Sequence, residues 1–300
     1  MNQTLERLPH GAHVAVIRLR SLGDCVLTTP ALTLLKAHRP DLQIAVVVED
    51  RFAAVFDGNP GISRILAPTA AAISAWHPQL VLNAHGGSRS MLLTIASRAR
   101  LRAGWAHHTW SAAYNVRIPR AQEILNVDRV VHTAEHVASA MFYLGVPQSA
   151  IPRAVLFADP QPTRSPYAVI HAFASAAEKA WPAERFRAVA SHLKATGLEP
   201  VFLCGPADDA SPFHDFECLR GSLGRAKSLL KDASLFVGND SGPAHMAAAF
   251  GVPVVVLFGP SDPSVWAPWR TESRTFSNLG VLSEASVIAA AEELRAKVKA

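Results

Sequence analysis

The stretch that decides the fold reads LFVGNDSGPAHMAAAFGVPVVVLFGPSDPSVWAPW and covers residues 235–269. An apolar run stops at a Gly-Asn-Asp turn, and an alanine-rich segment then continues to Phe250, which predicts a strand, a tight turn and a helix. A Gly-Val-Pro sequence closes that helix, and residues 254–258 form a second buried strand. This order of elements predicts an α/β fold with a parallel sheet.

The turn between the first strand and the helix is predicted to bind an anionic group, with phosphate as the leading candidate. A helix that begins at Ser241 or Gly242 directs its free N–H groups and its positive dipole end at the turn, and the glycine allows close approach. Asp240 and His245 stand at the same helix start, where ionisable side chains indicate a bound ligand. The alternative is an ordinary βαβ unit whose turn residues serve backbone geometry alone.

The same alternation of strand and helix extends over the whole chain, with a break in the middle. Residues 146–166 hold five prolines, the densest proline stretch of the sequence, and are predicted to be a linker. We therefore expect an N-terminal domain over 1–150, a C-terminal domain over 151–285, and a C-terminal helix over 286–300 that could pack back on the N-terminal domain. Further strands are predicted over 13–19, 43–48, 64–66, 79–83, 167–171 and 200–204, and helices over 26–38, 51–57, 90–99, 135–144, 183–196 and 223–231.

Composition limits the class of function. The 300 residues are 49% apolar, with a formal net charge of +5 and a pI of about 9.4. The basic excess is spread along the chain, which favours an acidic small substrate or an anionic membrane surface over nucleic acid. Three cysteines at no metal-like spacing indicate free thiols in a reducing compartment. With no signal-peptide pattern and no membrane-spanning run, a cytoplasmic location is expected.

Three motifs of other enzyme classes bear on the function: one occurs and is discounted, and two are absent. Residues 132–136 read HTAEH and match the H-x-x-E-H pattern of one class of zinc peptidases. The motif is short and a third ligand is not evident, so no metal site is expected. Neither a G-x-G-x-x-G fingerprint nor a Walker A loop occurs, which argues against a nicotinamide dehydrogenase and a P-loop kinase.

Four segments together resemble the ADP-heptose–lipopolysaccharide heptosyltransferases of glycosyltransferase family 9. These segments are IRLRSLGDCVLTTPAL (17–32), EKAWPAERF (178–186), CGPADD (204–209) and GNDSGPAH…FGPSDP (238–263). The resemblance runs in order over nearly the whole chain. It implies the GT-B fold, in which two Rossmann-like domains face each other across a cleft, with the acceptor on the first domain and the ADP-sugar on the second.

The resemblance also implies roles for single residues. Asp24 matches the position of the catalytic base, and Lys179 matches a lysine that contacts phosphate. Asp240, Ser241 and Gly242 match the turn that holds the sugar and diphosphate, with His245 beside it. Either Asp208 or Asp209 matches an acidic position near the nucleotide ribose, and Ser175 is the candidate for a phosphate-binding hydroxyl.

The expected function is thus inverting transfer of a heptose from ADP-heptose to the lipopolysaccharide inner core, without metal or other cofactor. The acceptor is a lipid-linked oligosaccharide, and peripheral contact with the anionic inner membrane is expected. The alternatives are a GT-B transferase or epimerase that uses another sugar nucleotide, and a two-lobed binding protein without catalysis. If Asp24 is the base, Asp24→Asn should slow turnover and leave the melting temperature nearly unchanged.

Overall fold

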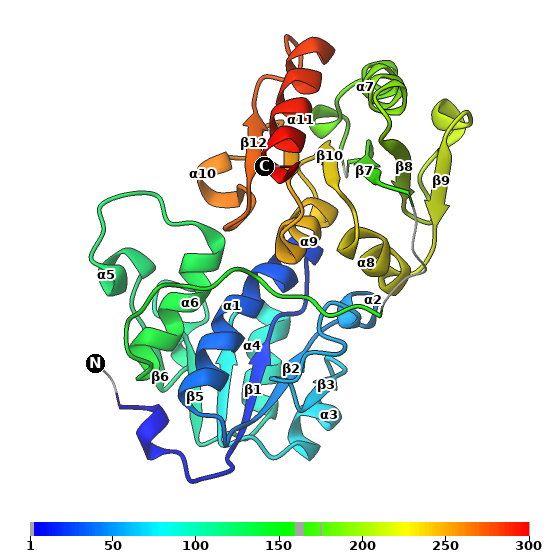
Figure 1. Cartoon of the computed structure of the whole chain (residues 1–300). Coiled ribbons are helices and arrows are strands. Elements are labelled where there is room, and N and C mark those ends of the chain that lie inside the picture. Colours follow the sequence, from blue (N-terminus) through cyan, green and yellow to red (C-terminus); the bar gives the residue numbers. More distant parts are fainter. Residues whose placement is uncertain (1–2, 160–164, 175, 300) are drawn as a thin grey trace. The chain divides into compact units, whose positions relative to one another are not determined.

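A computed structural model describes residues 3–159, 165–174 and 176–299. The chain divides into two compact units, Met1–Phe157 and Ala158–Ala300, and each unit is built on one parallel sheet of six strands (Figure 1). The predicted α/β class with two Rossmann-like halves is confirmed. The units divide seven residues after position 150, where the sequence placed the boundary, inside the predicted proline-rich linker.

The first sheet has the order β3-β2-β1-β4-β5-β6. Its central strands are buried apart from the first residues of β1 and β2, since both faces of a parallel sheet are covered by helices. The strands are β1 (His13–Ile17), β2 (Gln43–Val47), β3 (Arg64–Leu66), β4 (Leu80–Asn83), β5 (Leu101–Trp105) and β6 (Val116–Ile118).

The helices of the first unit divide between the two faces of its sheet. In chain order they are η1 (Leu5–Arg7), α1 (Leu22–His38), α2 (Asp50–Ala53), α3 (Ala70–Ala75), α4 (Ser88–Ala96), η2 (Ser111–Ala113), α5 (Ala121–Leu125) and α6 (Thr133–Leu144). Helix α1 packs on α6, whereas α4 packs on α3 and η2 (Figure 1). Right-handed connections explain this division, because β1 leads through α1 to β2 in one direction and β4 leads through α4 to β5 in the other.

The second unit repeats this topology with the order β12-β11-β10-β7-β8-β9. Its strands are β7 (Tyr167–His171), β8 (Glu199–Cys204), β9 (Glu217–Arg220), β10 (Leu235–Asn239), β11 (Val254–Leu257) and β12 (Ser273–Phe276). Its helices are η3 (Ala177–Lys179), α7 (Ala183–Ala195), η4 (Ser211–Phe213), α8 (Leu223–Lys231), α9 (Gly242–Phe250), α10 (Pro263–Trp266) and α11 (Glu284–Lys299).

The last helix belongs to the core of the second unit. Sequence alone allowed it to pack back on the N-terminal domain, but α11 packs on α7, β10 and β11. Its apolar residues Val287, Ala291 and Leu294 are buried in the same cluster as Phe186 of α7. No described helix is both long enough and apolar enough to cross a membrane.

Candidate functional site

The two sheets share one feature that defines where ligands bind in such folds. In the first sheet the chain leaves β1 and β4, which are neighbours, in opposite directions, and in the second sheet it does the same at β7 and β10. The crevice outside the carboxyl ends of two such strands is the usual ligand site of an open α/β sheet. Asp24 follows β1, Lys179 follows β7, and the turn at Asp240 follows β10.

Asp24 lies in the first turn of α1 and uses both of its carboxylate oxygens. The Ser21 backbone N–H donates to Oδ2 at 3.2 Å, and the Ser21 hydroxyl donates to the same oxygen at 3.0 Å. This is the helix-capping contact of a carboxylate at the third helical position. Oδ1 accepts from Arg18 Nη1 at 3.2 Å. The carboxylate therefore caps the helix and is also paired with a cation.

Arg18 is a site residue that sequence reasoning missed. Its side chain is 7% exposed, and its Nε donates to the Thr28 hydroxyl at 3.1 Å. Burial lowers the pKa of Arg18, and the charge of Asp24 opposes that shift. The sequence could have indicated this residue, because an arginine directly follows an otherwise apolar strand and a buried arginine requires a partner. Asp24, six residues later, is the partner.

Three histidines, His85, His108 and His136, lie near this ion pair, and His107 adjoins two of them. His85 follows β4, His107 and His108 follow β5, and His136 lies in α6 with its ring stacked on Trp105 at 4.4 Å. Burial lowers the pKa of all four, to about 4 for His136, and the charge of Arg18 acts in the same direction on His85, His108 and His136. The imidazoles near Asp24 are therefore neutral hydrogen-bonding groups at neutral pH.

The predicted anion site in the second unit lies at the start of α9. Ser241 is the N-cap residue, Gly242 begins the helix, and Pro243 occupies its first turn. The Ser241 hydroxyl oxygen is buried and has no hydrogen-bond partner among the described residues. An unpaired buried hydroxyl costs stability, so its place beside free helix N–H groups indicates a ligand that completes the bonding.

Charged side chains adjoin this helix start. Burial raises the pKa of the Asp240 carboxyl, whereas a hydrogen bond from Ser261 and the charge of Lys179 act in the opposite direction. The backbone after β11 approaches the Lys179 segment closely. A Cβ on Gly259 would meet the Glu178 carbonyl oxygen at 2.6 Å, so only glycine fits at this position. Lys179 and Asp240 are therefore brought close together at the carboxyl ends of β7 and β10.

Asn239 connects the segments that form this site. Its Oδ1 accepts from the Trp181 backbone N–H at 3.1 Å, and its Nδ2 donates to the Ala172 carbonyl at 2.8 Å. Asn239 is fully buried at the end of β10, one residue before Asp240. The side chain thus fixes both ends of the loop from β7 to α7, which carries Lys179.

The two acidic residues after β8 have different surroundings. Asp208 accepts from the Gly205 N–H at 2.6 Å, and its charge acts on His171 at the end of β7, whose pKa burial lowers to about 4. Asp209 accepts from the backbone and hydroxyl of Ser211, both at 2.9 Å, in a local turn just before η4. Of the two candidates, Asp208 is the one directed at the strand ends.

Three further sequence expectations concern His245, Ser175 and the H-x-x-E-H motif. His245 lies in α9, is buried, and has its ring 6.4 Å from that of Trp266. Ser175 lies outside the described residues. In the H-x-x-E-H motif, His132 caps α6 by accepting from the Ala134 N–H at 3.1 Å, and Glu135 pairs with Arg129 at 2.7 Å. In the described part of the chain, no three His, Cys, Asp or Glu side chains are placed to hold a metal ion.

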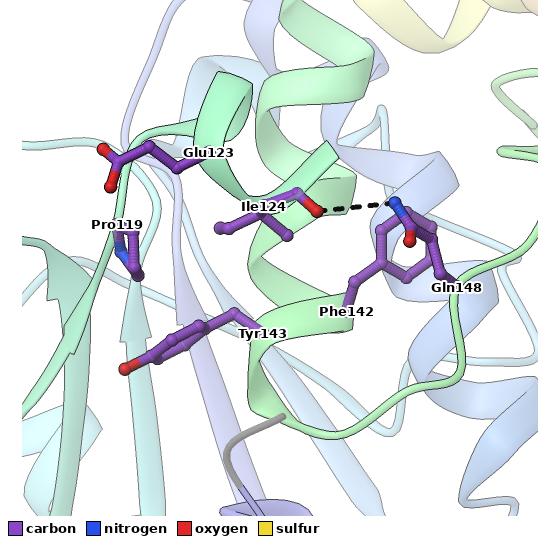
Figure 2. Close-up of a pocket in the computed structure, with 6 residues that line it drawn as sticks. All are labelled: Pro119, Glu123, Ile124, Phe142, Tyr143 and Gln148. Carbon is purple, nitrogen blue, oxygen red and sulfur yellow. Dashed lines mark hydrogen bonds between the residues drawn. The ribbon is translucent and has the colours of Figure 1, made fainter. Parts of the chain in front are cut away.

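A pocket of about 330 Å³ lies elsewhere in the first unit, between α5 and α6. Figure 2 shows its lining side chains, with the Gln148 amide donating to the Ile124 carbonyl at 3.5 Å. The pocket has aromatic and aliphatic walls and no cationic side chain, so it does not suit phosphate. Its lining residues are Pro119, Glu123, Ile124, Phe142, Tyr143 and Gln148.

Comparison with known proteins agrees with this arrangement. The model of glycosyltransferase family 9 (heptosyltransferase) matches residues 77–287. Lipopolysaccharide heptosyltransferase 3 of Escherichia coli K12 is 27% identical, with 84% of this chain and 83% of that protein covered. The family model thus covers the whole second half of the first unit and nearly all of the second unit.

Solved structures support the fold class. A family 9 glycosyl transferase from Veillonella parvula superposes with a TM-score of 0.85 at 22% identity, covering 95% of this chain and 97% of that one. The E. coli heptosyltransferase WaaC, solved with ADP, superposes with a TM-score of 0.78 at 20% identity, covering 94% and 99%. The GT-B fold class predicted from sequence is thus confirmed.

Proposed function

Because the chain belongs to glycosyltransferase family 9 (heptosyltransferase), we propose that it is an inverting enzyme that moves a heptose from ADP-heptose to the inner core of a lipopolysaccharide. Its relatives include a lipopolysaccharide heptosyltransferase and a heptosyltransferase solved with ADP, which supports this donor and acceptor. Family membership favours catalysis over a two-lobed binding protein. A GT-B enzyme that uses another sugar nucleotide is the remaining alternative.

The observation that carries the donor assignment is the unpaired Ser241 hydroxyl at the start of α9. A diphosphate oxygen there accepts from the hydroxyl and from the free N–H groups of the first helical turn. Lys179 supplies a cation to the same anion, and Asp240 is left to accept from sugar hydroxyls. Asp208 is the candidate for the nucleotide ribose.

The reaction is a single displacement at the anomeric carbon. The acceptor hydroxyl oxygen forms a bond to that carbon as the bond to the diphosphate oxygen breaks, and ADP leaves with the electron pair. The hydroxyl proton passes to a base, for which Asp24 is the candidate in the unit that binds the acceptor. The lysine and the helix N-terminus stabilise the charge that develops on the leaving diphosphate.

The donor assignment is tested by ADP binding and turnover. Lys179→Ala should weaken ADP binding about 10- to 150-fold and raise the donor KM by a similar factor, because a charged hydrogen bond contributes about 1.5–3 kcal/mol. Lys194→Ala is the matched control. Lys194 lies on α7, is 53% exposed and pairs with Glu199 on β8. An unchanged donor KM in Lys179→Ala would remove this lysine from the site.

The identity of the transferred sugar and the configuration at its anomeric carbon need a separate measurement. The purified protein is supplied with ADP-heptose and a lipid-linked inner-core acceptor, and the product is identified by mass spectrometry and by the anomeric coupling constant. Turnover of ADP-glucose in preference to ADP-heptose would favour the alternative donor. Retention of the anomeric configuration would contradict the inverting mechanism.

A further inference from the structure

Helix α4 exposes two large apolar side chains although it buries two hydroxyl side chains and Leu93. Ser90 and Thr94 are fully buried beneath it, whereas Leu92 and Ile95 are 60% and 51% exposed. A surface helix ordinarily buries its apolar positions and exposes its polar ones. The buried hydroxyls are satisfied locally, since Ser90 donates to the Gly86 carbonyl at 2.5 Å and Thr94 to the Ser90 carbonyl at 2.8 Å. The outward side of α4 therefore carries two large apolar side chains, with the exposed Ser88 and Arg89 in its first turn.

A third apolar side chain adjoins this face. Trp110 is 46% exposed and directly precedes η2, which packs on α4. Arg102 holds η2 in place by donating from Nε to the Ala113 carbonyl at 3.1 Å. Among the described residues, six large apolar side chains are exposed, and three of them belong to these two neighbouring elements.

The chain around α4 is strongly basic. Between Asp57 and Glu123 the sequence contains no acidic residue, although it contains seven arginines: Arg64, Arg89, Arg98, Arg100, Arg102, Arg117 and Arg120. Arg98 and Arg100 directly follow α4 and are exposed, and Arg89 in its first turn pairs with Glu49 at 3.1 Å. The apolar side chains of α4 are thus followed in the chain by two exposed arginines, while Glu49 is the acidic partner of Arg89 at the start of the helix.

We propose that the docking face, formed by Leu92, Ile95 and Trp110 with Arg98 and Arg100 at its border, binds the surface of an anionic phospholipid bilayer. Leucine, isoleucine and tryptophan side chains enter the headgroup region, and arginines attract anionic lipids. A second copy of the chain fits less well, because a two-fold contact would bring the arginines of one copy against those of the other.

The docking face is separate from the candidate catalytic groups. Helix α4 covers the sheet face with α3 and η2, while Asp24 lies in α1, which packs with α6 on the other face. The proposal therefore does not depend on which donor or acceptor the enzyme uses. It assigns a surface for membrane contact in addition to the proposed reaction.

The test is cosedimentation of the full-length protein with vesicles. We expect binding to vesicles of phosphatidylglycerol and phosphatidylcholine, and at least tenfold weaker binding to phosphatidylcholine alone. Binding should also weaken as salt is raised, because salt screens the arginines. The Leu92→Ser/Ile95→Ser variant should lose most of the binding, and Arg98→Gln/Arg100→Gln should lose about fivefold for each arginine.

Val281→Ser is the matched control, since Val281 is 85% exposed but lies in the second unit. It should leave vesicle binding unchanged, and the α4 variants should keep the wild-type melting temperature and ADP affinity. Equal binding to charged and neutral vesicles, or full binding by the α4 variants, would overturn the proposal. A dimer in light scattering that Leu92→Ser/Ile95→Ser abolishes, without vesicle binding, would instead assign the face to a second copy.

Discussion

Arg18 Nη1 donates to Asp24 Oδ1 at 3.2 Å, and the arginine is the more deeply buried partner, with 7% of its side chain exposed against 22% for the aspartate. The pair forms at the carboxyl end of β1, where the first strand meets the start of α1. Removing one partner of a buried pair leaves the other charge uncompensated, which is costlier than losing a helix cap. This relationship changes what a substitution at Asp24 should do.

We expect Asp24→Asn to lower kcat by about 10²–10⁴-fold, because asparagine keeps the shape of the side chain but cannot accept the proton of the acceptor hydroxyl. ADP affinity should be unchanged, since Asp24 lies in the first unit. The melting temperature should fall, contrary to the sequence-based expectation, because Arg18 loses its counter-charge. Steady-state kinetics, calorimetry with ADP and thermal unfolding give the three values.

A double variant separates the two roles of Asp24. In Arg18→Gln/Asp24→Asn no charge is left unpaired, so the melting temperature should recover relative to the single variant, while kcat stays low. Recovery of kcat together with the melting temperature would show that Asp24 acts through the stability of the helix start alone.

Ser241→Ala should stabilise the free protein and weaken ligand binding. The substitution removes a buried hydroxyl that has no partner among the described residues, whose burial costs about 1–3 kcal/mol. The same hydroxyl should donate to the diphosphate, so the affinity for ADP should fall about fivefold or more. Thermal unfolding with and without ADP measures both effects. A variant that is less stable without ligand would mean that the hydroxyl has a partner in the free protein.

Gly259→Ala should raise the donor KM by displacing the Lys179 segment. Its Cβ would meet the Glu178 carbonyl oxygen at 2.6 Å and the Lys179 Cα at 3.0 Å, so the two loops must separate. Gly280→Ala is the control, because a Cβ on Gly280 meets nothing within 4 Å. Donor KM values from initial rates compare the two variants. Equal values would indicate that the site tolerates the displacement.

Stability should fall in mild acid partly because of His136. Burial lowers its pKa to about 4, from an ordinary value near 6.5, so the unfolded chain binds a proton that the folded chain does not. The contribution is fully present above pH 6.5 and is lost as pH falls toward 4, at about 1.4 kcal/mol per pH unit. Urea unfolding from pH 7 to pH 4 measures this slope.

The matched variant for this measurement is His136→Phe, which keeps an aromatic ring to stack on Trp105. Its free energy of unfolding should depend less steeply on pH than that of the wild type over the same range. The same slope in both proteins would show that folding does not lower the pKa of His136.

Activity should persist in the presence of a chelator. The sequence offers no Asp-x-Asp pair beside the phosphate turn, and Lys179 with the start of α9 can neutralise the diphosphate. Initial rates with and without EDTA, followed by addition of Mg²⁺ or Mn²⁺, check this prediction. Activity lost with EDTA and restored by either ion would contradict it.

Much of the fold could be predicted from the sequence because the buried strands are strongly apolar. The strand over 64–66, the strand over 167–171 and the helix over 223–231 have the predicted bounds. Four strands were missed: β6, β9 (Glu217–Arg220) and β12 (Ser273–Phe276) lie at sheet edges, whereas β5 lies inside the first sheet. Edge strands are short and carry polar side chains, so neither length nor periodicity distinguishes them from loops.

Part of the candidate site could likewise be predicted from the sequence, and part could not. Asp240, Ser241 and Gly242 lie close together in sequence, so a strand, a turn and a helix start predict their meeting. His136 approaches Asp24 only through the packing of α6 on α1, which no local pattern encodes, whereas Arg18 meets Asp24 across the short connection from β1 to α1. The choice between Asp208 and Asp209 likewise depended on which carboxylate is occupied by a local turn, and Asp209 is the one that accepts from Ser211.

The Asn239 carboxamide has a kinetic consequence. Because its two hydrogen bonds hold Trp181 and Ala172 before any ligand arrives, the donor does not have to bring these segments together itself. The conformational entropy of these segments is then lost during folding and not during binding, so association with the nucleotide can be fast. Variants that weaken individual contacts should therefore shorten the residence time of the nucleotide much more than they slow its arrival.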